Sequence, residues 1–219
     1  MNITWLGQSC FKIEEKVKGE VVTVVTDPYD KTIGLRLPKS KANLVTVSHD
    51  HHDHNNVEGV LGLEEKEPFI IDRSGEYEYK GVFVTGVGSF HDKKEGEERG
   101  KSVMFRIEIA GVSVLHCGDL GTKLSDAQLE KIGEVDILLV PVGGKYTVNA
   151  KEAAEVVRQI EPRVVVPMHY KIPGLDLDID DVKAFSKEMG NGSEVIGKLK
   201  MNKKDLPIDE IKLVILEKQ

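Results

Sequence analysis

The sequence is poor in cysteine and has no long apolar runs, and both features narrow the class of protein. Two cysteines, Cys10 and Cys117, in 219 residues do not make a disulfide framework, so we expect a reducing compartment. No apolar run approaches the roughly 18 to 20 residues that cross a bilayer, which argues against a membrane protein. Residues 1–5 lack the basic and apolar regions of a signal peptide. We therefore expect a cytoplasmic protein.

Basic residues are fewer than acidic ones: the chain has 30 Lys and Arg and 37 Asp and Glu, so its formal net charge is -7. This balance argues against non-specific binding to nucleic acid or to an anionic membrane. It does not exclude a small anionic substrate held at a locally positive metal site. The chain is 40% hydrophobic, enough for a sizeable core, and no low-complexity linker divides it. We expect one domain over residues 1–219.

Apolar and β-branched runs predict strands along most of the chain. Ala110-Gly111 separates two of these runs and is a hairpin signal. The last run, residues 211–216, predicts a C-terminal strand. The predicted strands are residues 11–13, 20–26, 44–47, 69–71, 82–85, 103–109, 112–116, 135–140, 164–167 and 211–216.

Helices are expected mainly in the second half of the chain. Ser125 stands three residues before Gln128, and Asn149 three before Glu152, which is the pattern of a capping box. Pro162 ends the second helix, which lies between two predicted strands and so forms a strand–helix–strand unit. The predicted helices are one that follows Ser125, residues 150–160 and residues 180–189.

Four of the seven histidines lie within six residues, His49-Asp50-His51-His52-Asp53-His54. Imidazole and carboxylate are ligands that suit zinc and its neighbours among the transition metals. In an extended segment, residues two apart point to the same side, so His49 and His51 converge on one ion. A turn after them sends Asp53 and His54 toward a second ion. A polar surface patch is the alternative, but the segment closely follows an apolar strand, where a site at the rim of a sheet is expected.

Three further metal-binding side chains each stand near the end of a predicted strand. They are His91, Asp119 and His169. Loops at strand ends are the usual place for such a site, so we expect these residues to complete it.

Other candidate ligands have a better structural interpretation. His52 falls between ligand positions and is expected to point away. His116 lies in a strand and is interpreted as a hydrogen-bonded structural histidine. Cys10 and Cys117 are interpreted as small buried hydrophobic residues with reduced thiols.

The motif His-x-His-x-Asp-His, followed by single His, Asp and His residues, resembles the metallo-β-lactamase superfamily. The resemblance is greatest to its small branch of zinc-dependent hydrolases, which includes a sugar-phosphate lactonase, and it extends to about Lys171. It implies an α/β fold, a four-layer αββα sandwich with the site at one edge. Supporting segments are Gly7-Gln8-Ser9-Cys10-Phe11, Thr26-Asp27-Pro28, Gly75-Glu76-Tyr77-Glu78, Pro141-Val142-Gly143-Gly144-Lys145-Tyr146-Thr147 and Pro167-Met168-His169-Tyr170.

The resemblance also implies a site with two divalent metal ions. Zinc is the expected metal, with manganese or iron as alternatives. Asp27 is expected to orient a ligand histidine without touching the metal. Gln8 departs from the family, because relatives often have histidine there. The implied ligands are His49, His51 and His91 for one ion, Asp53, His54 and His169 for the other, and Asp119 as the bridge.

Substrate contacts are expected from loops that the resemblance places near the metals. Lys145, Tyr146 and Tyr170 are the candidates. Arg99 and Lys101 belong to the same loops, and for every basic residue a solvated surface position is equally open. The charged segment 92–101 is an exposed loop by composition, and it also borders the site if His91 is a ligand.

The implied activity is hydrolysis of a small-molecule substrate, an ester, lactone or phosphodiester. A hydroxide shared by the metals attacks the substrate, with Asp53 and Asp119 as the catalytic carboxylates and Asp53 protonating the leaving group. Relatives with redox di-iron centres tend to place Glu where this chain has His51, so a nitrogen ligand there favours hydrolysis. The alternative is a non-catalytic metal-binding or sensing module. The sequence makes no prediction of the oligomeric state.

Overall fold

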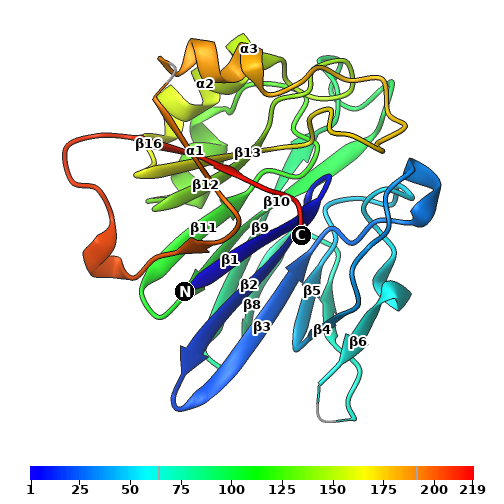
Figure 1. Cartoon of the computed structure of the whole chain (residues 1–219), viewed down its shortest axis with the longest axis vertical. Coiled ribbons are helices and arrows are strands. Elements are labelled where there is room, and N and C mark those ends of the chain that lie inside the picture. The colour runs from blue at the N-terminus through cyan, green and yellow to red at the C-terminus, as the bar shows by residue number, and fades with distance from the viewer. Residues whose placement is uncertain (64, 191) are drawn as a thin grey trace.

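The computed structural model describes residues 1–63, 65–190 and 192–219. Within these residues the strands form a six-stranded sheet, an eight-stranded sheet and a separate pair of strands (Figure 1). The six-stranded sheet has the order β15-β1-β2-β3-β5-β7. Its strands are β1 (Asn2–Gly7), β2 (Cys10–Val17), β3 (Glu20–Thr26), β5 (Leu44–Thr46), β7 (Phe69–Ile71) and β15 (Leu199–Lys200).

The eight-stranded sheet has the order β14-β16-β13-β12-β11-β10-β9-β8. The segment from β11 to β16 is parallel, whereas β8 to β11 pair antiparallel. Its strands are β8 (Gly75–Tyr79), β9 (Val82–Phe90), β10 (Lys101–Ile109), β11 (Val112–His116), β12 (Ile137–Pro141), β13 (Val164–Met168), β14 (Ser193–Ile196) and β16 (Lys212–Leu216), and the separate pair is β4 (Ser40–Ala42) with β6 (Val60–Gly62).

The two large sheets share one hydrophobic core. Side chains alternate along a strand, so Val22 and Val24 of β3 enter this core together with Phe105 and Leu139 of the other sheet. Val25, the next residue after Val24, belongs to a second apolar cluster on the opposite face of the six-stranded sheet. Apolar residues of the loop that follows β3 cover that face.

The α-helices lie on the side of the eight-stranded sheet, at the top of Figure 1. Both predicted capping boxes are present, at Ser125 and Asn149. No helix in the described residues is long and apolar enough to cross a membrane. The helices are α1 (Asp126–Ile132), α2 (Ala150–Ile160) and α3 (Lys183–Glu188), and the 3₁₀ turns are η1 (Lys31–Ile33), η2 (Val57–Gly59) and η3 (Lys203–Asp205).

The predicted two-sheet α/β fold is confirmed, and so is the strand–helix–strand unit β12–α2–β13. The helix predicted over residues 180–189 begins later, at Lys183. The reason is that the backbone of Asp180 is bonded outside the helix, to Gly143 and Lys171. Strands β1, β4, β6, β8, β14 and β15 were not predicted from the sequence. The extent of the single domain stays a prediction.

Candidate metal centre

The candidate ligands lie at the carboxyl ends of strands from both large sheets. Residues 49–54 follow β5, and Asp27 follows β3, its parallel neighbour. In the other sheet His91 follows β9, Asp119 follows β11 and His169 follows β13. The three strands run in the same direction, so their ends meet at one edge of the sandwich.

The segment 49–54 is a compact turn, so the extended conformation predicted for His49–His51 is wrong, whereas the turn predicted after them is present. The N–H of His51 donates to the carbonyl of His49 at 3.1 Å, and the N–H of His54 donates to the carbonyl of His51 at 2.8 Å. This turn keeps His49 and His51 close while it carries Asp53 and His54 to the next position. The convergence expected from the spacing is therefore present, but a turn produces it.

The structure gathers the seven predicted ligands into two adjacent groups. Within each group the potential ligand atoms all lie within 4.8 Å of one another. All but His51 are buried. The first group is His49, His51 and His91, and the second is Asp53, His54, Asp119 and His169.

The Asp119 carboxylate lies between the two groups. Its Oδ2 atom is 3.2 Å from Nε2 of His91, which belongs to the first group, and 3.2 Å from Nε2 of His169, which belongs to the second. The Oδ1 atom is 3.3 Å from Nε2 of His54. One carboxylate therefore faces nitrogen donors of both groups.

Unpaired buried atoms indicate that the second group fits a cation. Nε2 of His54 and Oδ1 of Asp119 are buried and have no hydrogen-bond partner, because their 3.3 Å contact does not have hydrogen-bond geometry. In the first group, Nε2 of His49 and Nδ1 of His51 face each other at 2.9 Å. Buried polar atoms without partners are rare, and imidazole with carboxylate is a donor set that zinc accepts.

Asp27 fixes the ring of His54 from the side away from the other ligands. Its Oδ2 accepts a hydrogen bond from Nδ1 of His54 at 2.8 Å, while the hydroxyl and the N–H of Ser48 donate to its two oxygens. Burial opposes the negative charge of Asp27, but His116, His54 and Ser48 together lower its pKa below the ordinary value. The carboxylate thus holds the His54 ring with Nε2 directed at the second group.

Two further contacts orient candidate ligands. Nδ1 of His91 donates to the carbonyl of Tyr146 at 3.0 Å. The side-chain amide of Gln8 donates to Oδ2 of Asp53 at 3.0 Å, across 45 positions of sequence. Sequence reasoning did not assign this role to Gln8. The only signal was its departure from the histidine that relatives often carry.

Ionisation differs between the buried histidines. Burial lowers the pKa of His49 to about 3, so this ring is neutral at pH 7, the form that binds metals. Burial also disfavours a charge on His54, but the nearby carboxylates of Asp119 and Asp53 raise its pKa above the ordinary value. Three buried carboxylates around His54 thus favour positive charge at the second group.

A glycine lets the Asp119 loop pass close to the histidine segment. Gly118 has a φ of 54°, and a Cβ there would lie 2.6 Å from Cβ of Ser48. A side chain at this position would push the two loops apart and move Asp119 away from the histidines.

The residues interpreted as structural lie outside both groups. His52 is exposed, and Cys10 and Cys117 are free and buried. Nε2 of buried His116 lies 2.7 Å from the carbonyl of Ser9, which satisfies one ring nitrogen.

The three residues predicted to contact substrate lie in different environments in the structure. Tyr146 lines a cavity of about 390 Å³ over the two groups, with Arg99 and Leu177. Lys145 is largely exposed and pairs with Asp178. The substrate contact predicted for Tyr170 is wrong. Its ring is buried and packs on Trp5 with ring centroids 5.0 Å apart, so it does not line this cavity.

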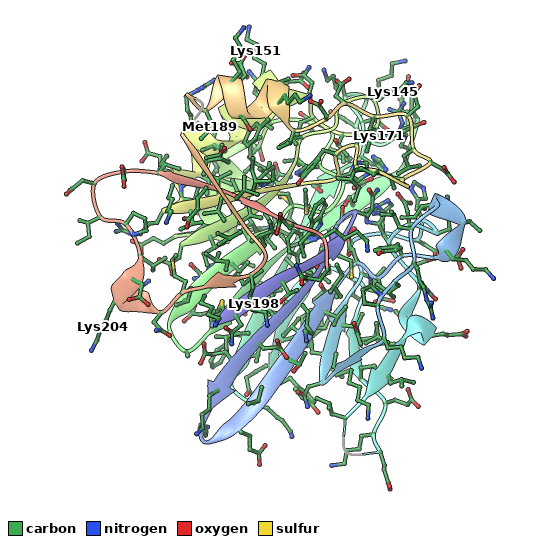
Figure 2. The ribbon with its side chains drawn as sticks, viewed as in Figure 1. Lys145, Lys151, Lys171, Met189, Lys198 and Lys204 are labelled. Atoms are coloured by element: carbon green, nitrogen blue, oxygen red, sulfur yellow. The ribbon has the colours of Figure 1, made fainter. Side chains whose placement is uncertain are left out.

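The loops that carry Lys145 and Lys171 lie side by side at the upper right of Figure 2. Asp180 joins them, because its N–H donates to Gly143 at 2.8 Å and its carbonyl accepts from Lys171 at 2.8 Å. The ammonium group of Lys171 also donates to the carbonyl of Leu177 at 2.8 Å, which holds that side of the cavity. Lys101 stands at the start of β10, outside this cavity.

Comparisons with known proteins identify the family of this chain. A family model described as "Beta-lactamase superfamily domain" matches residues 2–169. A UPF0173 metal-dependent hydrolase of Methanopyrus kandleri is 30% identical over 226 residues, covering 90% of this chain and 96% of the relative. A Thermotoga maritima crystal structure, provisionally described as a Zn-dependent hydrolase of the metallo-β-lactamase superfamily, is 36% identical with a TM-score of 0.78, covering 99% of both chains.

The fold alone does not fix the chemistry. A di-iron β-hydroxylase from Streptomyces venezuelae has the same fold with 15% identity and a TM-score of 0.57, covering 85% of this chain and 49% of the other. The family match and the full-length relatives are more specific than this likeness. On their evidence the chain belongs to the metallo-β-lactamase superfamily and, within it, to the UPF0173 metal-dependent hydrolases.

Proposed function

We propose that this protein hydrolyses a small ester, lactone or phosphodiester at a centre of two divalent metal ions. The observation that carries the proposal is the position of Asp119, whose Oδ2 lies 3.2 Å from a histidine of each group. A carboxylate shared in this way would serve as a ligand to both ions. Three imidazoles would hold the first ion, and two imidazoles with Asp53 would hold the second.

A pair of such ions would supply a water that ionises near neutral pH and positive charge for the developing oxyanion. The donor set supports zinc, because it is rich in imidazole and has nitrogen at His51. Manganese and iron are the alternatives.

The chain's own contribution is orientation and proton transfer. Asp27 holds His54, and the carbonyl of Tyr146 holds His91. Asp53 borders the cavity and would take the proton that the attacking water releases and pass it to the leaving group, while the amide of Gln8 fixes its Oδ2 atom. We also propose a cytoplasmic location, on the basis of the sequence.

The test of the two-metal proposal begins with metal content. The purified protein should hold two equivalents of zinc per chain and hydrolyse at least one class in a panel of lactones, nitrophenyl esters and nitrophenyl phosphodiesters. The variants His54→Ala and Asp53→Ala should lose the second ion and fall to the uncatalysed rate, because each removes a ligand. Mass spectrometry of the metals and initial rates give the two readouts.

The matched control for metal content is His52→Ala, which removes an exposed histidine of the same turn that lines the cavity but belongs to neither group, so both metals should remain. Full activity in His54→Ala would overturn the proposal. Two bound metals without turnover of any class would instead favour the non-catalytic metal-binding or sensing module.

Replacing Gln8 by alanine should weaken binding of the ion at Asp53 by about 10- to 100-fold, the usual effect of losing a group that orients a ligand. Gln8 is buried, and its amide donates to Asp53 at 3.0 Å. Chelator competition measures the affinity, and thermal unfolding of the metal-free variant checks that it is folded. An unchanged affinity in a folded variant would show that this hydrogen bond does not position Asp53.

A further inference from the structure

A second cavity adjoins the one over the metal ligands. Its volume is about 330 Å³, and it extends over the loop after β9 and the start of α2. His91, Arg99 and Tyr146 line both cavities. These three residues therefore form the boundary between the candidate metal centre and an adjacent space that the proposed chemistry does not use.

Arg99 is held at this boundary from two sides. Its backbone N–H donates to Oδ2 of Asp92 at 2.8 Å, and Asp92 accepts three more N–H groups of the same loop. Its guanidinium lies 5.7 Å from the centroid of the Tyr146 ring. The carbonyl of Tyr146 in turn accepts from His91. The loop, the arginine and a candidate metal ligand are thus connected through a short chain of contacts.

The N–H donors of the Arg99 guanidinium are available to a ligand. Its charged neighbour is Glu98, at 3.7 Å, and within the described part of the chain its N–H groups donate no hydrogen bond. The side chain is 35% exposed, less than the lysines that line the same cavity. Those lysines are paired with surface carboxylates: Lys93 with Glu152, Lys94 with Glu98 and Lys145 with Asp178.

We propose that Arg99 binds a second anionic group of the substrate, a carboxylate or a phosphate, in the cavity beside the metal centre. This inference rests on the proposed hydrolase function and names its substrate class: small molecules with a negative group separate from the bond that is cleaved. A guanidinium offers two parallel N–H donors, which match the paired oxygens of either group.

Other groups around the cavity also favour a negatively charged substrate group. Asn149, the N-cap of α2, lines the cavity, so the N-terminus of an 11-residue helix borders it, and the Glu152 carboxylate there accepts from the N–H of Asn149. The oxygens of Asp92, its most buried acid, are occupied by four backbone N–H groups and do not repel an anion strongly. An anion here would also lie beside the divalent ions, which attract it.

The test compares matched substrates in the zinc-loaded protein. The probes are a neutral γ-lactone, the same lactone with a carboxylate, and the same lactone with a phosphomethyl group. The wild type should prefer one or both anionic members in kcat/KM. In Arg99→Ala this preference should fall by about 10- to 100-fold, the loss expected for a hydrogen bond to a charged group. The carboxylate and phosphate members separate the two sources of charge.

Two variants serve as controls. Arg73→Ala also removes one arginine next to an acidic residue, here Asp72, but Arg73 lies outside both cavities, so this variant should keep the wild-type preference. Arg99→Lys should recover only part of the preference, because an ammonium is a point charge without the paired donors. Arg99→Ala keeps the backbone bond to Asp92, so the loop and the metal content should persist.

A binding measurement separates this inference from the hydrolase proposal. Calorimetric titration uses the ring-opened products, each of which carries the carboxylate that hydrolysis forms. The product with the additional anionic group should bind more tightly than the product without it, and Arg99→Ala should remove the difference. Turnover without any anionic preference would overturn the Arg99 subsite alone. Absence of turnover with the binding difference intact would overturn the hydrolase proposal alone. Equal losses on neutral and anionic substrates in Arg99→Ala would assign Arg99 a structural role.

Discussion

A chain that ends at Asp209 is expected not to fold cooperatively. It lacks β16, which lies between β13 and β14 in the eight-stranded sheet. Without β16, β13 loses its parallel partner on one side, and β14 loses the strand with which it pairs. The effect is therefore larger than the loss of an edge strand. Circular dichroism and urea unfolding of the shortened chain measure it.

The energy involved is comparable to the stability of a whole domain. Leu213, Val214 and Leu216 are buried in the main core. Burying a side chain of this kind contributes about 1.5–3 kcal/mol, so the three contribute about 5–9 kcal/mol. Native domains are stable by only about 5–15 kcal/mol.

A chain ending at Glu217 is the matched control. It keeps β16 and loses the backbone hydrogen bond from Gln219 to Trp5, worth about 1 kcal/mol. It should therefore unfold cooperatively, near the midpoint of the full chain. Cooperative unfolding of the chain ending at Asp209 would contradict the role assigned to β16.

The variant Asp119→Asn is expected to lose metal from both ligand groups, whereas the loss of any other candidate ligand should remove metal from one group only. The side chain keeps its shape but not its charge, and its Oδ2 faces both groups in the wild type. Each zinc ion at 100 times its dissociation constant should stabilise the wild type by about 2.7 kcal/mol, so two ions should contribute about 5.4 kcal/mol, or about 11–22 °C in Tm. The variant should show no such increase, and its hydrolysis should fall to the uncatalysed rate.

The control for this variant is Asp136→Asn, a buried aspartate outside both groups that pairs with Lys203 at 2.8 Å. It should lower the stability of the protein but keep the increase in Tm caused by zinc. Thermal unfolding with zinc and with a chelator gives both values. An unchanged zinc effect in Asp119→Asn would rule out a bridging carboxylate.

Much of the fold could be predicted because its signals are local. Strands β3, β7 and β11 have the predicted bounds, since β-branched runs between turn residues show their ends in the sequence. The capping boxes at Ser125 and Asn149 depend on residues three apart and were also predictable. Strands such as β14 and β15 are short or exposed and are defined mainly by their pairing partners, so no local pattern indicated them.

The sequence by itself determined which side chains form the candidate metal centre, because seven residues suited to ligating zinc stand in a dense segment or at strand ends. Only the tertiary structure decided what surrounds them. It brought Gln8 to Asp53, placed Tyr170 in the core and set Arg99 over Tyr146. These contacts join residues far apart in the chain, and their formation depends on how the loops of two sheets pack at one edge. Ligand chemistry can be read from residue type, whereas a neighbour across the fold depends on packing that spacing does not encode.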